Sequence, residues 1–283
     1  MKIRGLYQPN KTVISFEIFP PRQQSGAGSV YDALADLGAL KPDFISVTYG
    51  AGGAGGDAAL TAEIAARVKT DCGGTALAHL TCAELTAQTA GAAAALLKQK
   101  GIENVLALKG DGAGSGGFRY AKDLLAALKP HGFCLGAAAY PEGHIACDDL
   151  DEDLDYLKQK QDSGADFLIT QLFFTNEIFY RFLDKARAKG VTLPVSAGVM
   201  PILSRSQIER MIFMCGASLP SPIVKLINKY GERGDDLRQA GVEYSCRQIQ
   251  DLCDRGAQGV HIYTMNKPFI ARFILQNLRV KRI

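Results

Sequence analysis

The run Thr12 to Phe19 reads TVISFEIF, and it is the first of a series of short apolar segments that recur along the chain. Each has the length of a strand, and several are almost continuously apolar, which is typical of strands in a parallel sheet covered on both sides. The segments that follow are Asp43 to Gly50, Thr75 to Cys82, Asn104 to Asp111, Cys134 to Pro141, Asp166 to Phe174, Pro194 to Pro201 and Gly259 to Asn266. Together with the first, they predict eight strands.

The stretches between these strands are long enough for helices and carry helical spacing, as in Ala58 to Val68 and Asp149 to Gln161. A glycine stands where several of these helices should end, at Gly101, Gly132, Gly164 and Gly190. The first seven strands begin about every 30 residues, which is the length of one βαβ unit. Strand and helix therefore alternate through most of the chain.

The interval between the seventh and eighth strands is about twice as long as one βαβ unit. It holds further helical segments at Ser204 to Cys215, Pro222 to Lys229 and Asp236 to Asp254. Eight strand–helix units predict an α/β fold, a (β/α)8 TIM-type barrel, with extra helices between strands seven and eight. A doubly wound sheet is the alternative. No linker or change of composition divides residues 1–283, so we expect one catalytic domain.

The composition describes an ordinary soluble protein, with 47% hydrophobic and 22% charged residues among 283. The net charge of +3 gives no reason to expect nucleic acid or a membrane surface as a partner. The seven cysteines form no C-x-x-C pair, and no His, Asp or Glu spacing suggests a metal site. Without an apolar segment of membrane-spanning length, we expect a cytoplasmic protein with free thiols.

Two glycine-rich loops, Gly50 to Gly55 and Gly112 to Gly117, match the pattern G-x-G-x-x-G. A dinucleotide fingerprint also needs an acidic residue at the end of the next strand, and here the strand after the first loop ends in Cys82. The second loop lacks that acid as well. We therefore interpret both as loops at the mouth of the barrel that can close over a ligand.

The chemistry of a (β/α)8 barrel lies at the carboxyl ends of its strands, and polar residues gather there. Glu17 interrupts the first apolar run, and burying its carboxylate without a purpose would be costly. Burial would raise its pKa, which suits a general acid near neutral pH. Asp111 follows Gly110, which lets the backbone approach a ligand closely. A surface-facing or paired Glu17 and a turn-forming Asp111 are the alternatives.

The motifs at these strand ends resemble those of the methylenetetrahydrofolate reductase family, in the short form found in bacteria. They fall in order between about residues 13 and 278. They are Phe16 to Arg22 (FEIFPPR), Ser46 to Ala51 (SVTYGA), His79 to Cys82 (HLTC), Leu106 to Asp111 (LALKGD), Ala139 to His144 (AYPEGH), Thr170 to Phe174 (TQLFF) and Tyr263 to Asn266 (YTMN).

The resemblance implies an FAD-containing barrel that reduces 5,10-methylenetetrahydrofolate to 5-methyltetrahydrofolate and so feeds methionine synthesis. NADH or NADPH would donate the hydride in a ping-pong relay through the flavin. The family also suggests a homo-oligomer. Glu17 would protonate the folate, and Asp111 would lie near both flavin and folate and tune them electrostatically.

The resemblance also implies binding residues. With Asp111, the FAD contacts would be Thr48, Tyr49, His79, Lys109, Gly110, Tyr120, Ala121, Tyr140, His144, Asp153 and Lys160. With Glu17 and Asp111, the folate contacts would be Gln171, Gln207 and Lys267. Asp153 and Lys160 are seven residues apart on an expected helix and share a face, which fits one ligand that touches both.

The chain departs from the family pattern at Lys109, Gln159 and Met211. Lys109 stands where an arginine is more usual, so a bidentate contact would become a point charge. Met211 falls where some members have a stacking phenylalanine, and Phe213 is out of helical phase with that position. Two alternatives stay open: another FAD barrel oxidoreductase of the proline-dehydrogenase type, and a non-catalytic folate- or nucleotide-binding subunit.

Overall fold

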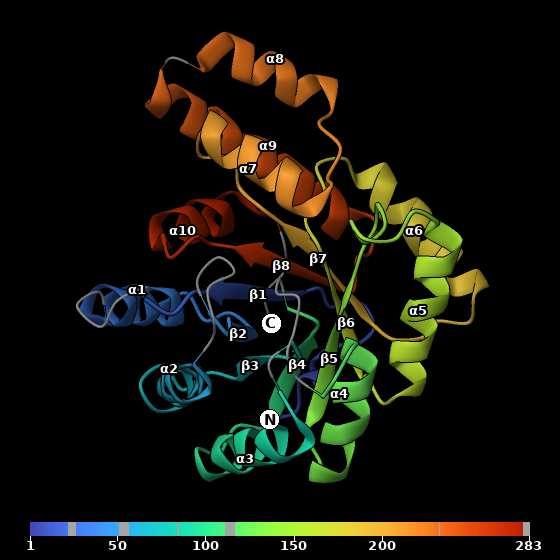
Figure 1. Cartoon of the computed structure of the whole chain (residues 1–283). Coiled ribbons are helices and arrows are strands. Elements are labelled where there is room, and N and C mark those ends of the chain that lie inside the picture. The colour runs from blue at the N-terminus through green and yellow to red at the C-terminus, as the bar shows by residue number, and fades with distance from the viewer. Residues whose placement is uncertain (22–26, 51–56, 84, 111–116, 232, 280–283) are drawn as a thin grey trace.

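The computed structural model describes residues 1–21, 27–50, 57–83, 85–110, 117–231 and 233–279. Its strands form a closed barrel in which each strand pairs in parallel with its neighbours in sequence order, and β8 returns to β1 (Figure 1). The strands are β1 (Val13–Ile18), β2 (Phe44–Val47), β3 (Ala76–Thr81), β4 (Asn104–Leu108), β5 (Cys134–Ala139), β6 (Phe167–Thr170), β7 (Val195–Val199) and β8 (Gly259–Tyr263). The predicted (β/α)8 barrel is confirmed, and the doubly wound alternative is wrong.

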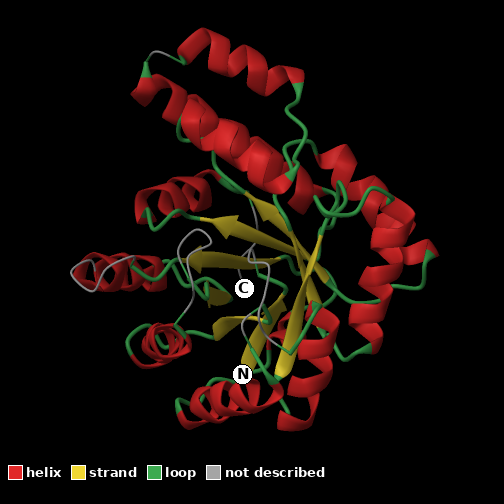
Figure 2. Ribbon diagram, viewed as in Figure 1, coloured by secondary structure: helices red, strands yellow, loops and turns green. Residues whose placement is uncertain are grey.

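Helices surround the barrel, as Figure 2 shows. Those of the regular units are α1 (Ala27–Ala39), α2 (Ala58–Thr70), α3 (Ala87–Gln99), α4 (Ala121–Leu128), α5 (Leu150–Asp162), α6 (Asn176–Ala188) and α10 (Pro268–Asn277). Side chains of Asp57, Thr86 and Asp149 accept hydrogen bonds from the first-turn amides of α2, α3 and α5. The four expected helix stops, Gly101, Gly132, Gly164 and Gly190, all have positive φ.

Three further helices stand between β7 and β8, where the long interval predicted them. They are α7 (Arg205–Cys215), α8 (Ser221–Tyr230) and α9 (Gly234–Asp254). They lie together at the top of Figure 1, with α8 outermost. Ile208 and Ile223 are fully buried in an apolar cluster that joins this group to the loops after β6 and β7. The added helices therefore cover the carboxyl ends of β6 to β8.

The amino-terminal end of the barrel, where the strands begin, is filled with apolar side chains. We call it the lower end, and the end where the strands stop the upper end. Phe44, Leu77 and Phe167 point into the lower end and are fully buried. The 3₁₀ helix Ile3–Leu6 closes this end from below with the buried Ile3. The interior is thus a packed core at this end and not a channel.

The strands end earlier than the apolar pattern predicted. β4 stops at Leu108, two residues before Gly110 with its φ of +88°, and β6 stops at Thr170. The apolar residues after Thr170 are buried by packing of a loop, since Phe173 stacks on Phe179 of α6 at 5.3 Å. The two glycine-rich loops lie largely in 51–56 and 111–116, outside the described residues. None of the helices that the structure describes is long and apolar enough to cross a membrane.

Candidate active site

Glu17 points into the barrel near the carboxyl end of β1, and its side chain ends among polar groups of three other strands. It is only 6% exposed. Its Oε2 lies 3.5 Å from His261 Nε2, 3.6 Å from His79 Nε2 and 3.4 Å from the hydroxyl of Ser46. The strand register explains the meeting, because Glu17 pairs with Ser46 on one side and with Tyr263 on the other.

His261 is fully buried beneath Glu17, and both of its ring nitrogens have polar neighbours. Ser15 Oγ lies 2.8 Å from Nδ1, while Ser46 Oγ lies 3.3 Å from Nε2. An ionised carboxylate only accepts hydrogen bonds, so with Glu17 ionised Nε2 carries the proton and Nδ1 accepts from Ser15. Ser15 can instead donate to the carbonyl of Val260 at 3.4 Å, which lets Nδ1 carry the proton. Either tautomer of the ring therefore has hydrogen-bond partners among these groups.

His79 of β3 completes the group around Glu17 as a neutral ring. Burial lowers the pKa of His79 to about 4, and the charge of Glu17 opposes that shift only in part. Its Nε2 is buried without a hydrogen-bond partner among the described residues. A buried polar atom without a partner carries a desolvation cost unless a ligand bonds to it. His79 Nε2 is therefore placed to form a hydrogen bond with a ligand at the mouth of the barrel.

The expected direction of the pKa shift at Glu17 is wrong. Burial raises the pKa of this carboxyl, but the hydrogen bond from His261, the charges of His79 and His261, and the hydroxyl of Ser46 outweigh it, so the pKa lies below its ordinary value. At neutral pH His79 is uncharged, which leaves the hydrogen bond from His261 as the main cause we assign. Without a ligand, Glu17 is therefore ionised at neutral pH.

The backbone around Glu17 is held by the loop that follows β8. Thr264 Oγ1 donates to the carbonyl of Glu17 at 2.7 Å. The side-chain amide of Asn266 makes two hydrogen bonds to the backbone of Phe19. It accepts from the N–H at 2.8 Å and donates to the carbonyl at 2.9 Å. Met265 and Asn266 have φ of +55° and +53°, which is uncommon for residues other than glycine. This turn fixes where β1 ends and so where the carboxylate lies.

Hydrogen bonds at the same end of the barrel link β8 to β6 across β7. Tyr263 Oη donates to the carbonyl of Thr170 at 2.8 Å, and Thr170 Oγ1 accepts from the amide of Gly198 at 2.8 Å. A Cβ at Gly198 would lie 2.3 Å from the Thr170 carbonyl and 2.9 Å from Tyr263 Oη. The absence of a side chain at Gly198 is what lets the tyrosine of β8 reach β6.

Cationic and aromatic residues cluster on the β5 side of the mouth. Lys160 of α5 donates to the carbonyl of Ala138 at 2.9 Å and lies 5.0 Å from the centre of the Tyr140 ring. Burial lowers the pKa of Lys160 to about 8, although the charge of Asp153 raises it. Tyr140 packs edge-on against His144, with ring centres 4.7 Å apart. Asp153 and Lys160 interact electrostatically, as their shared helix face predicted.

The charges in this cluster make it attractive to an anion. Burial and the charges of Lys109 and Lys160 all lower the pKa of His144. Burial raises the pKa of Asp153, which is 7% exposed and accepts a hydrogen bond from the backbone amide of His144. Gln159, where the chain departs from the family pattern, accepts a hydrogen bond from Lys122 at 2.7 Å. This bond links α5 to α4.

The other expected cofactor residues occupy neighbouring loops. Thr48 and Tyr49 follow β2 and are half-buried, with Thr48 donating to the carbonyl of Gly50 at 2.9 Å. Tyr120 caps α4 and is 42% exposed, with Ala121 buried behind it. A side chain at Gly110 would press on Thr81 and Ala83, at 3.1 and 3.2 Å. Packing on Thr81 and Ala83, together with the positive φ, therefore explains the glycine at 110.

The expected folate contacts are less open. The Oε1 of Gln171 accepts from the next backbone amide at 2.8 Å. Gln207 bridges its own loop, accepting from the amide of Leu203 at 2.8 Å and donating to the carbonyl of Pro201 at 3.3 Å. Lys267 is exposed at the start of α10, and Met211 is half-buried in the cluster beneath α7. Each amide keeps further donor and acceptor capacity, so these contacts orient the two side chains without excluding a ligand.

Asp111 lies outside the described residues, so its predicted role stays a prediction. No role for His261, Ser15 or Ser46 was assigned from the sequence. The signal for Ser15 is its position two residues before Glu17, which puts both on the same face of β1. The described residues include no group of three His, Cys, Asp or Glu side chains placed to hold a metal ion.

The comparisons with known proteins cover nearly the whole chain. The chain is 33% identical over 279 residues to "Methylenetetrahydrofolate reductase 1" of Schizosaccharomyces pombe, covering 95% of this chain and 46% of that protein. It is 31% identical over 272 residues to "5,10-methylenetetrahydrofolate reductase" of Escherichia coli, covering 95% of this chain and 91% of that protein. The chain thus spans about half the length of its fungal and plant relatives and most of its bacterial ones.

A solved structure shares the fold at low sequence identity. It is an uncharacterised protein from Clostridium thermocellum, described as binding two copies of 5-methyl-5,6,7,8-tetrahydrofolic acid. Its TM-score is 0.71 at 14% identity, with 98% of each chain covered. The family model for methylenetetrahydrofolate reductase matches residues 2–279, which include the strands, the Glu17 group and the cationic cluster. This chain belongs to the methylenetetrahydrofolate reductase family.

Proposed function

We propose that this protein reduces 5,10-methylenetetrahydrofolate to 5-methyltetrahydrofolate, with FAD as cofactor and NADH or NADPH as hydride donor. One observation carries the proposal: a buried carboxylate, Glu17, stands at the mouth of the barrel and is oriented by His261, which Ser15 holds in turn. Family membership and the names of the relatives support it. Its product would supply methyl groups for methionine synthesis.

The residues at the mouth fit FAD. Lys109 and Lys160 offer positive charge for a diphosphate, and His144 lies beside them as a neutral ring. The Nε2 of His79 lacks a partner among the described residues, and a polar ring edge would satisfy it. With these residues, Thr48, Tyr49, Asp111, Tyr120, Ala121, Tyr140 and Asp153 would hold the cofactor. When bound, FAD supplies a reversible carrier for the hydride.

The chain's own part is to deliver a proton. Glu17 would protonate a folate nitrogen so that the methylene bridge opens and its carbon becomes an acceptor for hydride. Glu17 would take this proton from solvent as the substrate binds, while His261 Nε2 donates a hydrogen bond to Oε2 and Ser15 holds Nδ1, so that the carboxyl keeps its orientation. Asp111, Gln171, Gln207 and Lys267 would orient the folate.

The low pKa of Glu17 without ligands sets a condition on this role. Planar ligands at the mouth would remove the remaining solvent from the carboxyl, and desolvation raises the pKa of an acid. Neutral His79 favours the same outcome, because it places no positive charge beside the carboxyl at neutral pH. We therefore expect Glu17 to take up its proton as the substrate binds.

The Glu17→Gln variant tests the proposal because it keeps the shape of the side chain and removes its acid. NADH should still bleach the flavin absorbance of the variant, whereas folate reduction should fall by about 10²- to 10⁴-fold, the usual contribution of a general acid. Glu63→Gln changes an exposed carboxylate on α2 and serves as the control that should keep full turnover. Full folate turnover by Glu17→Gln would remove Glu17 from the chemistry.

A purified protein that is colourless and cannot be reconstituted with FAD would contradict the cofactor and favour the non-catalytic alternative. A flavoprotein that oxidises NADH but is reoxidised by another substrate, and not by methylenetetrahydrofolate, would favour a different flavin barrel enzyme.

A further inference from the structure

Tyr263 of β8 crosses the inside of the barrel at its upper end. It points to the same side of β8 as His261, two residues before it, and the two rings meet edge-on with centres 5.3 Å apart. The strand register pairs Tyr263 with Glu17 of β1. Its hydroxyl reaches past β7 and donates to the carbonyl of Thr170, the last residue of β6. One side chain therefore connects the group around Glu17 with the end of β6.

The Tyr263 hydroxyl keeps its proton at neutral pH. Burial raises the pKa of this hydroxyl well above its ordinary value, and the charge of Glu17 raises it further. Its partner is a carbonyl oxygen, which can only accept a hydrogen bond. The hydroxyl is thus a fixed donor, and its contribution is to hold the backbone of β6.

The carbonyl that Tyr263 holds belongs to the peptide unit that leads into Gln171. The N–H of the same unit is the amide of Gln171, which donates to the carbonyl of Ala139 of β5 at 2.7 Å. Oγ1 of Thr170 in turn accepts from the amide of Gly198 of β7. A peptide unit is planar, so bonds at both its ends fix the direction in which the Gln171 side chain leaves β6.

Gln171 stands where a substrate contact is expected in this fold. It follows the last residue of β6 directly, at the carboxyl end of the barrel. Its Oε1 accepts from the amide of Leu172 at 2.8 Å, a bond that uses none of the hydrogens on Nε2. The backbone thus orients the side-chain amide and leaves it able to donate to a ligand.

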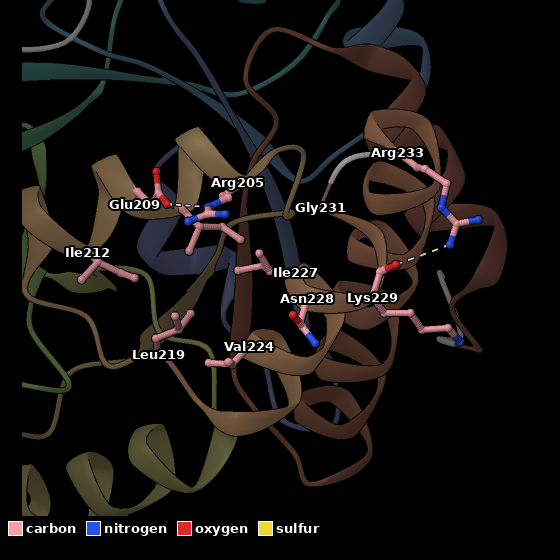
Figure 3. A pocket seen from close by; sticks show the side chains of 11 residues that line it. Arg205, Glu209, Ile212, Leu219, Val224, Ile227, Asn228, Lys229, Gly231 and Arg233 are labelled. Atoms are coloured by element: carbon pink, nitrogen blue, oxygen red, sulfur yellow. Dashed lines mark hydrogen bonds and ion pairs between the residues drawn. The ribbon is translucent and has the colours of Figure 1, made fainter.

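Packing from outside the barrel holds this region less firmly. Leu172 and Phe174, in the loop after β6, are buried in the apolar cluster beneath α7 and α8. On its outer side the cluster borders an open groove of about 560 Å³ between these helices, and Ile212 and Ile227 line that groove (Figure 3). Side chains that face open space lack packing partners on that side. The restraint on the end of β6 therefore comes mainly from inside the barrel, through Tyr263.

We propose that Tyr263 is a positioning residue for folate reduction, which sets the place of Gln171 relative to Glu17 by its bond across β7. The inference rests on the proposed function, in which Gln171 orients the folate and Glu17 protonates it. A misplacement of about 1 Å between such groups can slow a reaction by about 10²-fold. Because the ring of Tyr263 packs on His261 and its hydroxyl bonds next to Gln171, one rigid side chain keeps the proton donor and the substrate contact in register.

A double-mutant cycle tests whether Tyr263 acts through Gln171. Tyr263→Phe removes only the hydroxyl and should lower kcat/KM for methylenetetrahydrofolate by about tenfold, the weight of one well-placed hydrogen bond. Part of this loss should be a higher KM, because partial unfolding would lower kcat alone. Gln171→Ala should lower kcat/KM by at least as much. The double variant should be no slower than Gln171→Ala, because the bond then has no side chain left to position.

Unchanged kcat/KM in Tyr263→Phe, or losses that multiply in the double variant, would overturn the proposal. Tyr244→Phe is the matched control. Tyr244 of α9 donates to the carbonyl of Phe174 at 2.7 Å, so this variant removes the same kind of bond from the same loop on the outer side of the barrel. It should keep the kcat/KM of the wild type. An equal loss in Tyr244→Phe would mean that the loop needs only stability and that Tyr263 has no special place.

Amide hydrogen exchange supplies a second test that needs no turnover. Tyr263→Phe should speed the exchange of the amides of Gln171 and Gly198 by about tenfold, whereas Tyr244→Phe should leave Gly198 unchanged. If both amides exchange at the wild-type rate in Tyr263→Phe, the hydroxyl does not hold β6 and the proposal is refuted. A wild-type protein that reduces no methylenetetrahydrofolate would contradict the proposed function instead, and the exchange rates would still decide whether Tyr263 fixes the place of Gln171.

Discussion

The two ends of the barrel are built from the same strands and have opposite character. On β2, Phe44 points into the lower end and Ser46 into the upper end, and on β3 Leu77 and His79 divide in the same way. The lower side chains fill space and need no partner. The upper ones form a polar group around Glu17 that keeps a buried nitrogen without a partner among the described residues. The lower end therefore stabilises the fold, and the upper end gives up stability to hold reactive groups.

The largest effect should come from the lower end. Phe167→Ala removes a fully buried ring that packs on Phe44 and fills the space left by Gly136. It should lower the free energy of unfolding by about 3–5 kcal/mol, as for other buried aromatic residues. Urea titration measures this loss. Folate turnover per folded molecule at low temperature should stay near the wild-type value, and a large loss there would mean that the two ends are not separable.

A smaller effect should come from the upper end and have the opposite sign. Lys160→Met removes an ammonium whose pKa burial has lowered to about 8, so at pH 7 the variant should be more stable than the wild type without cofactor. We expect about 1–2 kcal/mol, because the side chain is partly exposed and solvent screens its charge.

The advantage of Lys160→Met should disappear as the pH rises from about 8 to 10.5. In that range the unfolded lysine holds its proton while the folded one releases it, so wild-type stability rises with pH. Burial raises the pKa of Cys134, Cys246 and Cys253 to about 11, which acts in the opposite direction. Those thiols are present in both proteins, so the difference in unfolding free energy at each pH isolates Lys160. A difference independent of pH would show that Lys160 does not titrate there.

The smallest effect should show whether Ser15 acts on folate reduction by positioning His261 or only supports the fold of the upper end. Ser15→Ala removes the hydroxyl that fixes Nδ1 of His261 and should slow folate reduction by about tenfold, the equivalent of one hydrogen bond of about 1.4 kcal/mol. Reduction of the flavin by NADH should be unchanged, because that step needs no proton from Glu17. Equal loss in both half-reactions would show that Ser15 only supports the structure.

Much of the fold could be predicted from the sequence because the strands follow one another in regular units. All eight strands and the three added helices were predicted in order. The strand ends were not, because the apolar residues continue into loops that are buried by other means. Phe173 and Phe174 are buried against α6 and the cluster beneath α7, and a sequence pattern cannot distinguish that burial from burial in a sheet.

The candidate site could be predicted less completely. Glu17 and His79 interrupt apolar runs and are visible in the sequence. The contacts of Ser15 and Ser46 with His261 depend on the register between β1, β2 and β8, which no local pattern encodes. The pKa of Glu17 was expected to rise because burial was apparent and its hydrogen-bonding neighbours were not. The expected folate contacts of Gln171 and Gln207 stay a prediction, and the bonds of both side chains to nearby backbone could not be read from the sequence.

Because Gly198 of β7 has no side chain, the residues that positions 170, 198 and 263 can accept depend on one another. Because the Tyr263 hydroxyl crosses β7 at this point to reach Thr170, even one methyl group at 198 must displace either the ring or the β6 carbonyl. Ala197 and Val199, on either side of Gly198, face the surrounding helices. A change of side-chain size at either position can therefore be compensated by a change in a helix residue packed against it. A library that randomises β7 should therefore return glycine at 198 and variety beside it, unless positions 170 and 263 are varied with it.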